Sequence, residues 1–295
     1  MQIMSLIRLA IPKGSLQQST IDLFKDAGWS VTMSSRSYFP SIDDPDIECA
    51  LVRAQEISRY VESGLFDVAL TGKDWILENS SDVFEVADLI YSKATYRPAK
   101  WVLAVDEKSS ITRIEELEGK KIATELVNFT KKYFKDRNIK VDVEFSWGAT
   151  EAKVVDGLAD AIVEVTETGS TIRAHNLKII DELLVTNTKL IANKESWKDS
   201  KKRTKIEQIA LMLKSALQAT GMAGLKMNAP KDKLEKIISM LPAITSPTVC
   251  PLHDPNWYSL EIIIHESQSR DLIPELLRTG ARGIIEYPLK KVLDG

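Results

Sequence analysis

The stretch Ala161-Ile-Val-Glu-Val-Thr-Glu-Thr-Gly-Ser-Thr171 runs from an apolar strand-like segment through a hydroxyl-rich turn into a helix start. Gly169 lets the backbone turn without a side chain in the way, and amides at a helix N-terminus favour an anion. Further donors come from the hydroxyls of Thr166, Thr168, Ser170 and Thr171. The loop has no lysine and no Walker spacing, so it favours a sugar monophosphate over a nucleoside triphosphate. The alternative interpretation is a solvated turn that caps a helix.

Strand-like runs alternate with helical periods over the first two-thirds of the chain. Strands are predicted at 6–11, 47–53, 68–71, 101–105, 121–123, 141–145 and 161–165. Helices are predicted at 16–27, with a stop at Gly28, and at 57–63, 129–136 and 151–157. Such alternation predicts an α/β fold with helices on both faces of its sheets, and ligands near the carboxyl ends of the strands.

The pattern changes after a predicted helix at 206–217. The remainder has the order strand, helix, strand, strand, helix, strand, at 224–229, 231–241, 248–250, 257–265, 269–279 and 283–287. This βαββαβ order predicts a ferredoxin-like domain, with Pro230 at the first helical position. Small domains of this kind often pair and hold an amino acid between them, although the fold alone does not establish that role.

Composition narrows the class of protein. A net charge of −3 over 295 residues argues against a nucleic-acid partner. The basic run 198–205 is interpreted as a solvated helix entrance or linker. Cys49 and Cys250 fit no metal or redox spacing, which favours a reducing compartment. We find neither a signal peptide nor an apolar run near the ~20 residues of a membrane span, so we expect a cytoplasmic protein.

Two further strand-to-helix junctions place a glycine beside a lysine, at Lys13-Gly14 and Gly72-Lys73. Each junction either contacts a phosphate or only caps a helix. Near strand ends, Arg36 and Arg53 could bind phosphates or form structural ion pairs. Glu125 and Glu151 could hydrogen-bond a ribose or hold Mg²⁺ through water, or could only favour a helix N-terminus. No triad order or zinc-ligand spacing is present, so we expect catalysis by positioning and electrostatics.

These segments together resemble the ATP phosphoribosyltransferases, the first enzymes of histidine biosynthesis, in their long form with a C-terminal regulatory domain. The specific matches are the loop 164–171 and Ser246-Pro-Thr-Val-Cys-Pro-Leu252. Weaker matches extend the resemblance nearly end to end, at 9–14, 65–74, 122–125, 157–162 and Leu241-Pro242. Many members have arginine in place of Ser15 and glycine in place of Ala243. We therefore expect the phosphate contacts of the first loop and the turn after Pro242 to differ from theirs.

The resemblance implies a two-lobed catalytic region similar to type II periplasmic binding proteins, followed by the ferredoxin-like regulatory domain. The implied boundaries are 1–95 for lobe I with a return segment at about 185–220, 96–184 for lobe II, and 221–295 for the regulatory domain. The implied reaction condenses ATP with phosphoribosyl pyrophosphate, with Mg²⁺, into phosphoribosyl-ATP and pyrophosphate. Histidine is the implied feedback inhibitor, and dimers that assemble into hexamers are implied without a separate regulatory subunit.

The resemblance also implies site residues. Lys13, Arg53 and Glu151 are the catalytic candidates. Phosphoribosyl pyrophosphate is expected at Glu164, Thr166, Glu167, Thr168, Gly169, Ser170 and Thr171, with Glu164 on the ribose hydroxyls. Weaker candidates for ATP or pyrophosphate are Gly14, Arg36, Gly72 and Lys73. Histidine is expected at Asn228, Thr248 and Gly283, and no protein ligand is assigned to the metal.

A different class of protein remains as the alternative: a two-lobed module that senses a small anion without catalysis. The apparent lack of a signal peptide weakens an exported receptor, and the lack of a basic pair of DNA-binding helices weakens a complete transcription regulator. Another phosphoribosyltransferase is disfavoured because we find no paired-acid loop. The C-terminal domain, which a simple receptor would lack, favours the long-form enzyme.

Overall fold

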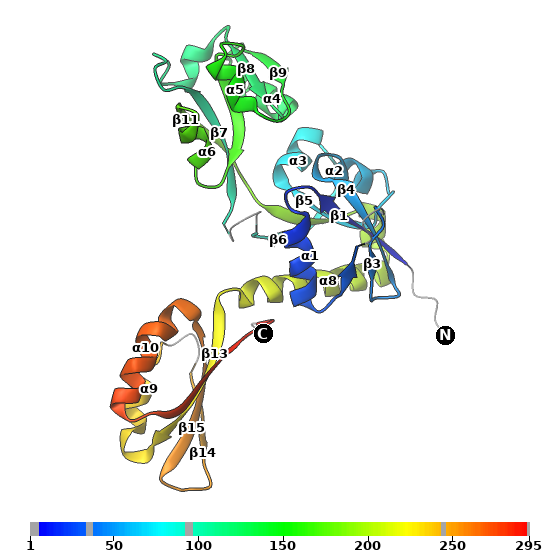
Figure 1. Cartoon of the computed structure of the whole chain (residues 1–295). Helices are drawn as coiled ribbons and strands as arrows, with labels where there is room; N and C mark the ends of the chain where they lie inside the picture. Colours follow the sequence, from blue (N-terminus) through cyan, green and yellow to red (C-terminus); the bar gives the residue numbers. More distant parts are fainter. Residues whose placement is uncertain (1–5, 34–37, 92–96, 243–245, 294–295) are drawn as a thin grey trace. The chain divides into compact units, whose positions relative to one another are not determined.

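A computed structural model describes residues 6–33, 38–91, 97–242 and 246–293. The chain forms two compact units, Met1–Leu211 and Met212–Gly295. Figure 1 colours the elements in chain order. Within the described ranges, we find no helix with both the length and the apolar character of a membrane span.

Lobe I, the first part of the N-terminal unit, is built on a sheet of order β4-β1-β5-β12-β6. Its strands are β1 (Ile7–Lys13), β4 (Ile47–Arg53), β5 (Val68–Gly72), β6 (Phe84–Leu89) and β12 (Thr188–Ala192). Its helices are α1 (Gln17–Ala27), α2 (Ala54–Glu62) and α3 (Lys73–Asn79), and a small ribbon pairs β2 (Val31–Thr32) with β3 (Ser41–Ile42). As predicted, α1 ends at Gly28, which adopts a left-handed conformation with φ 107°.

Lobe II, the second part of this unit, is built on a sheet of order β11-β7-β10-β8-β9. Its strands are β7 (Ala99–Asp106), β8 (Lys121–Thr124), β9 (Asp142–Phe145), β10 (Ala161–Thr166) and β11 (Leu177–Thr186). The helical elements are η1 (Ile114–Leu117), α4 (Val127–Lys135), α5 (Thr150–Val155) and α6 (Ser170–Ala174). One apolar core includes Phe134 of α4, and a second includes Val154 of α5 and Ile172 of α6. Alternate residues of the sheet strands enter these two cores, so helices cover both of its faces.

The order of the strands explains how the lobes are joined. The chain leaves lobe I after β6, builds lobe II from β7 to β11, and returns to lobe I through β12. Of the four strands that flank these two crossings, the sequence predicted β7 but not β6, β11 or β12. β1, β4 and β5 run parallel to one another, as do β8, β9 and β10. The loops after them therefore gather at one edge of each sheet.

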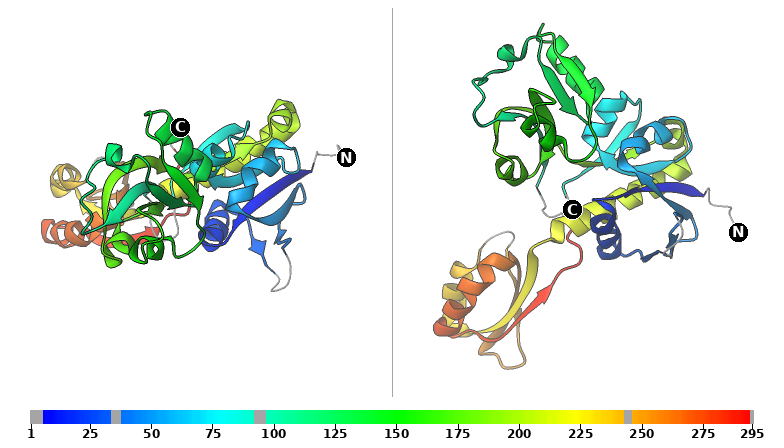
Figure 2. Two further views of the ribbon diagram at one scale, coloured as in Figure 1. Left: turned by 90° about the horizontal axis from the view of Figure 1, so that it is seen from above. Right: turned by 45° about the horizontal axis from the view of Figure 1, so that its top comes forward.

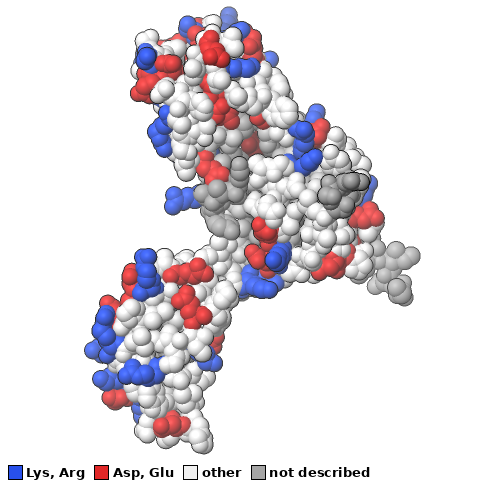
Figure 3. Space-filling model, viewed as in Figure 1, with Lys and Arg blue, Asp and Glu red and all other residues white. Residues whose placement is uncertain are grey.

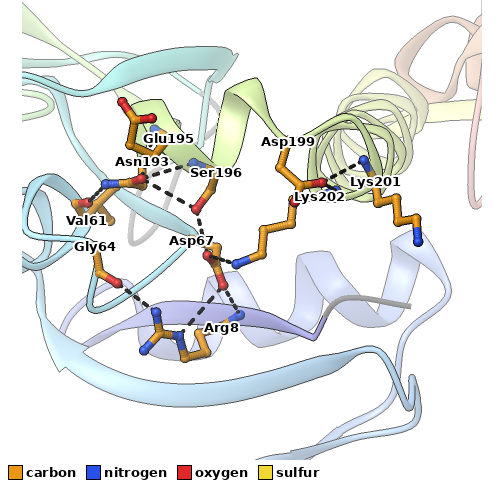
Figure 4. A network of polar contacts seen from close by, with 10 residues as sticks. All are labelled: Arg8, Val61, Gly64, Asp67, Asn193, Glu195, Ser196, Asp199, Lys201 and Lys202. Atoms are coloured by element: carbon orange, nitrogen blue, oxygen red, sulfur yellow. Dashed lines mark hydrogen bonds and ion pairs between the residues drawn. The ribbon is translucent and has the colours of Figure 1, made fainter. Parts of the chain in front are cut away.

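Buried ion pairs attach the connecting helix α8 (Ser200–Ala219) to lobe I, as Figure 4 shows around Asp67. The Asp67 side chain is 2% exposed and accepts hydrogen bonds from Lys202 Nζ (2.7 Å), from Ser196 Oγ of α7 (Lys194–Lys198, 2.7 Å) and from the Arg8 amide (2.8 Å). A charge this deeply buried needs such partners to offset its desolvation.

The basic run 198–205 is a helix entrance as predicted, and Lys198, Lys201 and Arg203 are exposed there, but the interpretation as solvated was wrong for Lys202 and Lys205. Lys202 and Lys205 both point into lobe I, where the Lys205 ammonium lies 2.6 Å from Asp44 and only 11% of its side chain is exposed. The partners Asp44 and Asp67 lie far away in the sequence, so the run reads as a solvated linker until the fold brings them together.

The C-terminal unit has the predicted βαββαβ order. Its elements are β13 (Met222–Pro230), η2 (Lys231–Lys233), α9 (Leu234–Met240), β14 (Thr248–Pro251), β15 (Trp257–His265), α10 (Glu266–Thr279) and β16 (Arg282–Pro288), with the sheet order β14-β15-β13-β16. Figures 1 and 2 show α9 and α10 on one face of this sheet. The prediction for Pro230 was wrong, because Pro230 ends β13 with extended backbone and α9 begins only at Leu234.

Charged side chains of both signs are interspersed on the face of each unit that Figure 3 shows. This mixture agrees with the net charge of −3. A nucleic-acid surface would instead need a basic stripe.

Candidate active site

A cleft of about 980 Å³ in the N-terminal unit is lined by loops from both lobes. Lobe I contributes the ends of β1, β4 and β5, and lobe II contributes the loops after β8, β9 and β10. Of the predicted residues, the following line it: Lys13, Gly14, Arg53, Gly72, Glu125, Thr166, Glu167, Thr168, Ser170 and Thr171. The cleft thus lies at the carboxyl ends of strands, where α/β folds usually bind ligands.

The loop after β10 is held in a tight turn. Gly169 has φ 72°, and its amide donates to Thr166 Oγ1 at 2.8 Å. The Arg173 guanidinium donates to the Thr168 carbonyl at 2.9 Å, and a Cβ added to Gly169 would lie 2.8 Å from Arg173 Nη1. Glycine is therefore required at this position for two reasons: the backbone is left-handed, and Arg173 approaches too closely to leave room for a side chain. The Ser170 and Thr171 side chains are exposed at the start of α6.

Glu164 lies on β10 below this loop, outside the residues that line the cleft. Burial, followed by the negative charge of Glu151, raises its pKa from 4.5 to about 7. Glu125, at the end of β8, also raises it, and burial raises the pKa of Glu125 in turn. These carboxyls form a poorly solvated cluster that gains from any ligand that donates hydrogen bonds or carries positive charge.

Two cations of lobe I reach the cleft from strand ends. Lys13 ends β1 and is exposed, with its ammonium 4.2 Å from the centre of the Tyr38 ring. Arg53 ends β4, and its guanidinium lies 5.0 Å from the centre of the Trp147 ring of lobe II. Gly14, which follows Lys13, has φ 110° and open space around it, so the backbone there is accessible to a ligand.

Gly72 has a steric role that the sequence did not reveal. A Cβ at this position would lie 1.9 Å from Asp74 Oδ1, because the Asp74 carboxylate folds back over the start of α3. Asp74 is 6% exposed, and its Oδ2 accepts a 2.7 Å hydrogen bond from the Trp101 indole of lobe II. Burial raises the pKa of Asp74, and hydrogen bonds from Trp101 and the Trp75 amide offset only part of this effect.

A second carboxylate of α3 also contacts lobe II. Glu78 accepts hydrogen bonds from the amides of Asn128 (3.0 Å) and Phe129 (2.9 Å), at the N-terminus of α4. A carboxylate at this position satisfies amides that lack partners within the helix and complements the helix dipole. Helix α3 therefore connects the two lobes beside the cleft.

The remaining predicted residues lie elsewhere. Lys73 is not among the residues that line the cleft, and its charge acts on Asp88. Glu151 lies on α5, is not among the residues that line the cleft, and its charge acts on Glu164. Arg36 lies outside the described residues, as does Ala243. Among the residues described, no group of three or more His, Cys, Asp or Glu side chains is placed to hold a metal ion.

The three residues predicted for histidine lie in the C-terminal unit, on the sheet face opposite α9 and α10. Residues of β13 alternate between the helix-covered core, which holds Leu225 and Met227, and the opposite face, where Asn228 lies. Thr248 begins the edge strand β14 and is exposed. A Cβ added to Gly283 (φ 58°) would lie 3.5 Å from Asn228 Nδ2. Asn228 and Gly283 are thus neighbours, and β15 separates them from Thr248.

The residues that sequence reasoning missed include Asp74 and Trp147, which line the cleft, and Arg173, which contacts the loop after β10. Arg173 follows the glycine loop by one helical turn, and this spacing could have identified it. Asp74 follows the Gly72-Lys73 junction, where its position in the sequence indicates only a helix cap. Trp147 has no sequence signal, because a tryptophan between a strand and a helix is usually expected in the core.

Comparisons with known proteins agree with this geometry. A family model described as "ATP phosphoribosyltransferase" matches residues 53–215, and one described as "HisG, C-terminal domain" matches residues 219–291. An ATP phosphoribosyltransferase of Desulfosudis oleivorans is 59% identical over 97% of this chain and 99% of its own length. The one of Solidesulfovibrio magneticus is 61% identical over 98% of this chain and 99% of its own length.

Among solved structures, a chain of the ATP phosphoribosyl transferase (HisG:HisZ) complex from Thermotoga maritima is similar to this one. The similarity has a TM-score of 0.61 at 28% identity, and it covers 71% of this chain and 97% of that chain. Together with the match to the C-terminal family model, this confirms the predicted fold class: a two-lobed α/β region followed by a ferredoxin-like domain.

Proposed function

The chain belongs to the ATP phosphoribosyltransferase family, and we propose that it condenses ATP with phosphoribosyl pyrophosphate in the first step of histidine biosynthesis. The products are phosphoribosyl-ATP and pyrophosphate. The observation that carries the proposal is the cleft, which combines a hydroxyl-rich glycine loop with the cations Lys13 and Arg53. Such a combination suits a substrate with phosphates at both ends of a ribose. The proposed compartment is the cytoplasm.

In the proposed reaction an adenine ring nitrogen attacks the anomeric carbon of phosphoribosyl pyrophosphate. A carbon–nitrogen bond forms, the carbon–oxygen bond to pyrophosphate breaks, and the departing oxygen takes the electron pair. The nitrogen already has a lone pair, so the protein need not supply a strong base. Its contribution is to align the two substrates and to stabilise the charge on the leaving group.

In this proposal the loop after β10 binds the 5-phosphate. The exposed hydroxyls of Thr168, Ser170 and Thr171 and the amides at the start of α6 are its donors. Glu164 accepts hydrogen bonds from the ribose hydroxyls, which would favour its charged form and offset the repulsion from Glu151. Glu151 would contact a substrate hydroxyl or amine.

Lys13 and Arg53 are proposed to bind the pyrophosphate or the ATP phosphates, with Gly14 and Gly72 allowing close approach of the backbone. Lys73 and Arg36 remain weaker candidates for the same role. Mg²⁺ prefers oxygen ligands, keeps several waters and commonly binds through phosphates and one or two carboxylates. Glu125 and Glu151 fit water-mediated contacts of this kind. Bound Mg²⁺ would neutralise charge on the departing pyrophosphate.

Histidine is proposed to bind the C-terminal unit at Asn228, Thr248 and the backbone near Gly283, and to inhibit the enzyme. These residues lie on the sheet face opposite α9 and α10. We further propose that the chain forms dimers that assemble into hexamers when histidine binds, without a separate regulatory subunit.

The decisive experiment is one assay. Purified protein is mixed with ATP, phosphoribosyl pyrophosphate and Mg²⁺, and product absorbance is followed with and without histidine and with EDTA. We expect product that disappears with EDTA and decreases with histidine. Failure to form product by a folded protein would contradict the catalytic proposal, and histidine-insensitive product would contradict only the regulatory part.

Two variants test the sites separately. Thr168→Ala combined with Gly169→Val should abolish binding of phosphoribosyl pyrophosphate while the protein stays folded, because a side chain at Gly169 would displace Arg173. Thr248→Ala should relieve histidine inhibition without lowering uninhibited turnover. Normal substrate binding by the first variant, or unchanged inhibition of the second, would refute the corresponding assignment.

A further inference from the structure

The cleft is lined by four described aromatic residues, and three of them belong to the packing of the protein itself. Trp101 is 1% exposed and donates its indole N–H to Asp74. Trp75 packs edge-on against Trp101, with 6.3 Å between ring centres. Tyr91 is 4% exposed and uses its hydroxyl within lobe I. Trp147 differs, because 62% of it is exposed and its ring borders the cleft.

The Trp147 ring is exposed on a rigid base. The residues that flank its loop, Ser146 and Thr150, are 2% and 1% exposed, and their hydroxyls are joined by a 3.1 Å hydrogen bond. Between them, Gly148 (φ 71°) and Ala149 (φ 49°) both adopt the left-handed conformation. For alanine this conformation carries a cost that a fold seldom retains without a local reason. The turn keeps this large apolar side chain in the cleft instead of the core.

The topology places Trp147 at a suitable distance from the phosphate loop. The sheet order β10-β8-β9 puts Trp147, after β9, two strands from the loop after β10 at the same carboxyl edge. Two strand spacings amount to roughly 10 Å. A ribose 5-phosphate bound at the loop, together with a ring next to its anomeric carbon, can span this distance.

The neighbour of Trp147 also suits a nucleotide. The Arg53 guanidinium lies 5.0 Å from the centre of the Trp147 ring. A planar aromatic surface beside an arginine offers stacking for a base and a cation for its phosphates. A phosphate sugar without a base would make no use of the ring.

We propose that Trp147 is the stacking platform for the purine ring of ATP and orients the ring nitrogen towards the anomeric carbon. This inference rests on the proposed function and assigns to it a residue that determines specificity for the base. Base–aromatic stacking is worth about 1–3 kcal/mol. The Michaelis constant for ATP therefore depends on Trp147, and that for phosphoribosyl pyrophosphate does not.

The test compares Trp147→Ala and Trp147→Phe with Phe145→Ala, which removes an equally exposed neighbouring aromatic that does not line the cleft. We expect the KM for ATP to rise about tenfold or more in Trp147→Ala, and to stay within about threefold in Trp147→Phe and Phe145→Ala. The KM for phosphoribosyl pyrophosphate should stay within about twofold throughout. An unchanged KM for ATP in Trp147→Ala, or a rise confined to the other substrate, would overturn the proposal.

A binding measurement separates this proposal from the catalytic one. ATP should quench the tryptophan fluorescence of the unmodified protein, and Trp147→Phe should bind ATP with much less quenching. Ribose 5-phosphate should quench neither protein. If the unmodified protein makes no product but ATP quenches Trp147, the catalytic proposal fails and the platform stands. If product forms but quenching is undiminished in Trp147→Phe, the platform fails and the catalytic proposal stands.

Discussion

Each lobe contains a strand with an aspartate before its first residue and a second carboxyl group at or near its carboxyl end. The fold lowers the pKa of the aspartate and raises the pKa of the second carboxyl group. In lobe I, β5 lies between Asp67 and Asp74. Burial alone would raise the pKa of Asp67, but hydrogen bonds from the Arg8 amide, Lys202 and Ser196 together lower it. At the other end, burial prevails and raises the pKa of Asp74.

Lobe II repeats this arrangement along β10. A hydrogen bond from the Lys121 amide, aided by Lys120, lowers the pKa of Asp160 before the strand, whereas burial raises that of Glu164 near its end. Asp160 exchanges hydrogen bonds with the backbone of Lys121, with both distances 2.9 Å.

Asp67 makes the same exchange with Arg8, at 2.9 and 2.8 Å. In both lobes, therefore, the amino end of the strand fixes the pairing of two parallel strands. The carboxyl end keeps a carboxyl group poorly solvated beside the cleft. Stability and ligand binding are assigned to opposite ends of the same strand.

The largest expected effect comes from removing the buried charge at the amino end. Asp67→Asn would place a neutral amide beside Lys202 and Ser196. The partly buried Lys202 ammonium would then lack its counter-ion. Breaking a buried pair in this way costs about 3 kcal/mol or more in the free energy of unfolding. Urea denaturation measures the cost.

Asp160→Asn is the matched control, since it changes the same motif where the side chain is 38% exposed. Exposed ion pairs contribute less than about 1 kcal/mol. Equal losses in the two variants would show that burial does not distinguish the lobes.

Gly72→Ala should have the next largest effect, at the carboxyl end of β5. The new Cβ would lie 1.9 Å from Asp74 Oδ1, so the carboxylate must leave the Trp101 indole or α3 must shift. Overpacking of this kind costs about 1–3 kcal/mol, and because Gly72 lines the cleft, activity should fall as well. Urea denaturation and the product assay measure the two losses.

Gly119→Ala provides the reference for Gly72→Ala, because Gly119 has a left-handed backbone (φ 73°) with open space around it. It should lose stability but retain activity. Full activity in Gly72→Ala would mean that the position of Asp74 does not matter to the cleft.

Much of this arrangement was predictable from the sequence where the signal is local. The runs at 47–53 and 257–265 coincide with β4 and β15, because apolar β-branched segments bounded by polar turns define strands well. β11 was missed because two register shifts, at Ile179/Asp181 and Glu182/Leu184, break its alternation. A shift of this kind moves the side chains that follow to the other face.

The site was predictable to a similar extent. The glycine-containing loops after β1, β5 and β10 have recognisable short motifs, and Arg53 directly ends a predicted strand. These loops and Arg53 line the cleft. The partners of Asp67 and Asp74 could not be predicted, since Lys202 and Trp101 lie 135 and 27 residues away in the sequence. Contacts of this kind depend on how the strands are ordered, which no local pattern encodes.

A pH titration tests whether the carboxyl end of β10 behaves as its environment implies. If ionised Glu164 holds the ribose hydroxyls, kcat/KM for phosphoribosyl pyrophosphate should rise about tenfold per pH unit below the pKa of about 7 and level off above it. Glu164→Gln should remove this dependence and leave a low, flat profile. An unchanged rise in the variant would assign the titration to the substrate phosphates.

Asp74→Asn should have the smallest effect on stability, and it gives the sharpest contrast with Asp67→Asn. The folded protein raises the pKa of Asp74 above its unfolded value of 3.8. The contribution of Asp74 to stability is therefore fully present below pH 3.8 and is lost as the pH rises through the folded value. An asparagine oxygen can still accept the Trp101 indole hydrogen without a buried charge, so at neutral pH the variant should match or exceed the unmodified protein, within about 1 kcal/mol.

The same substitution in Asp67 removes stability that is present above pH 3.8 and lost as the pH falls through the lowered folded value. Urea denaturation at pH 7 and at about pH 3, below the unfolded value of both carboxyl groups, distinguishes the two ends of β5. Asp67→Asn should lose most at pH 7, where Asp74→Asn loses nothing. If both variants lost stability in parallel, Asp74 would be a structural ion like Asp67, and the separation of stability from ligand binding along β5 would not hold.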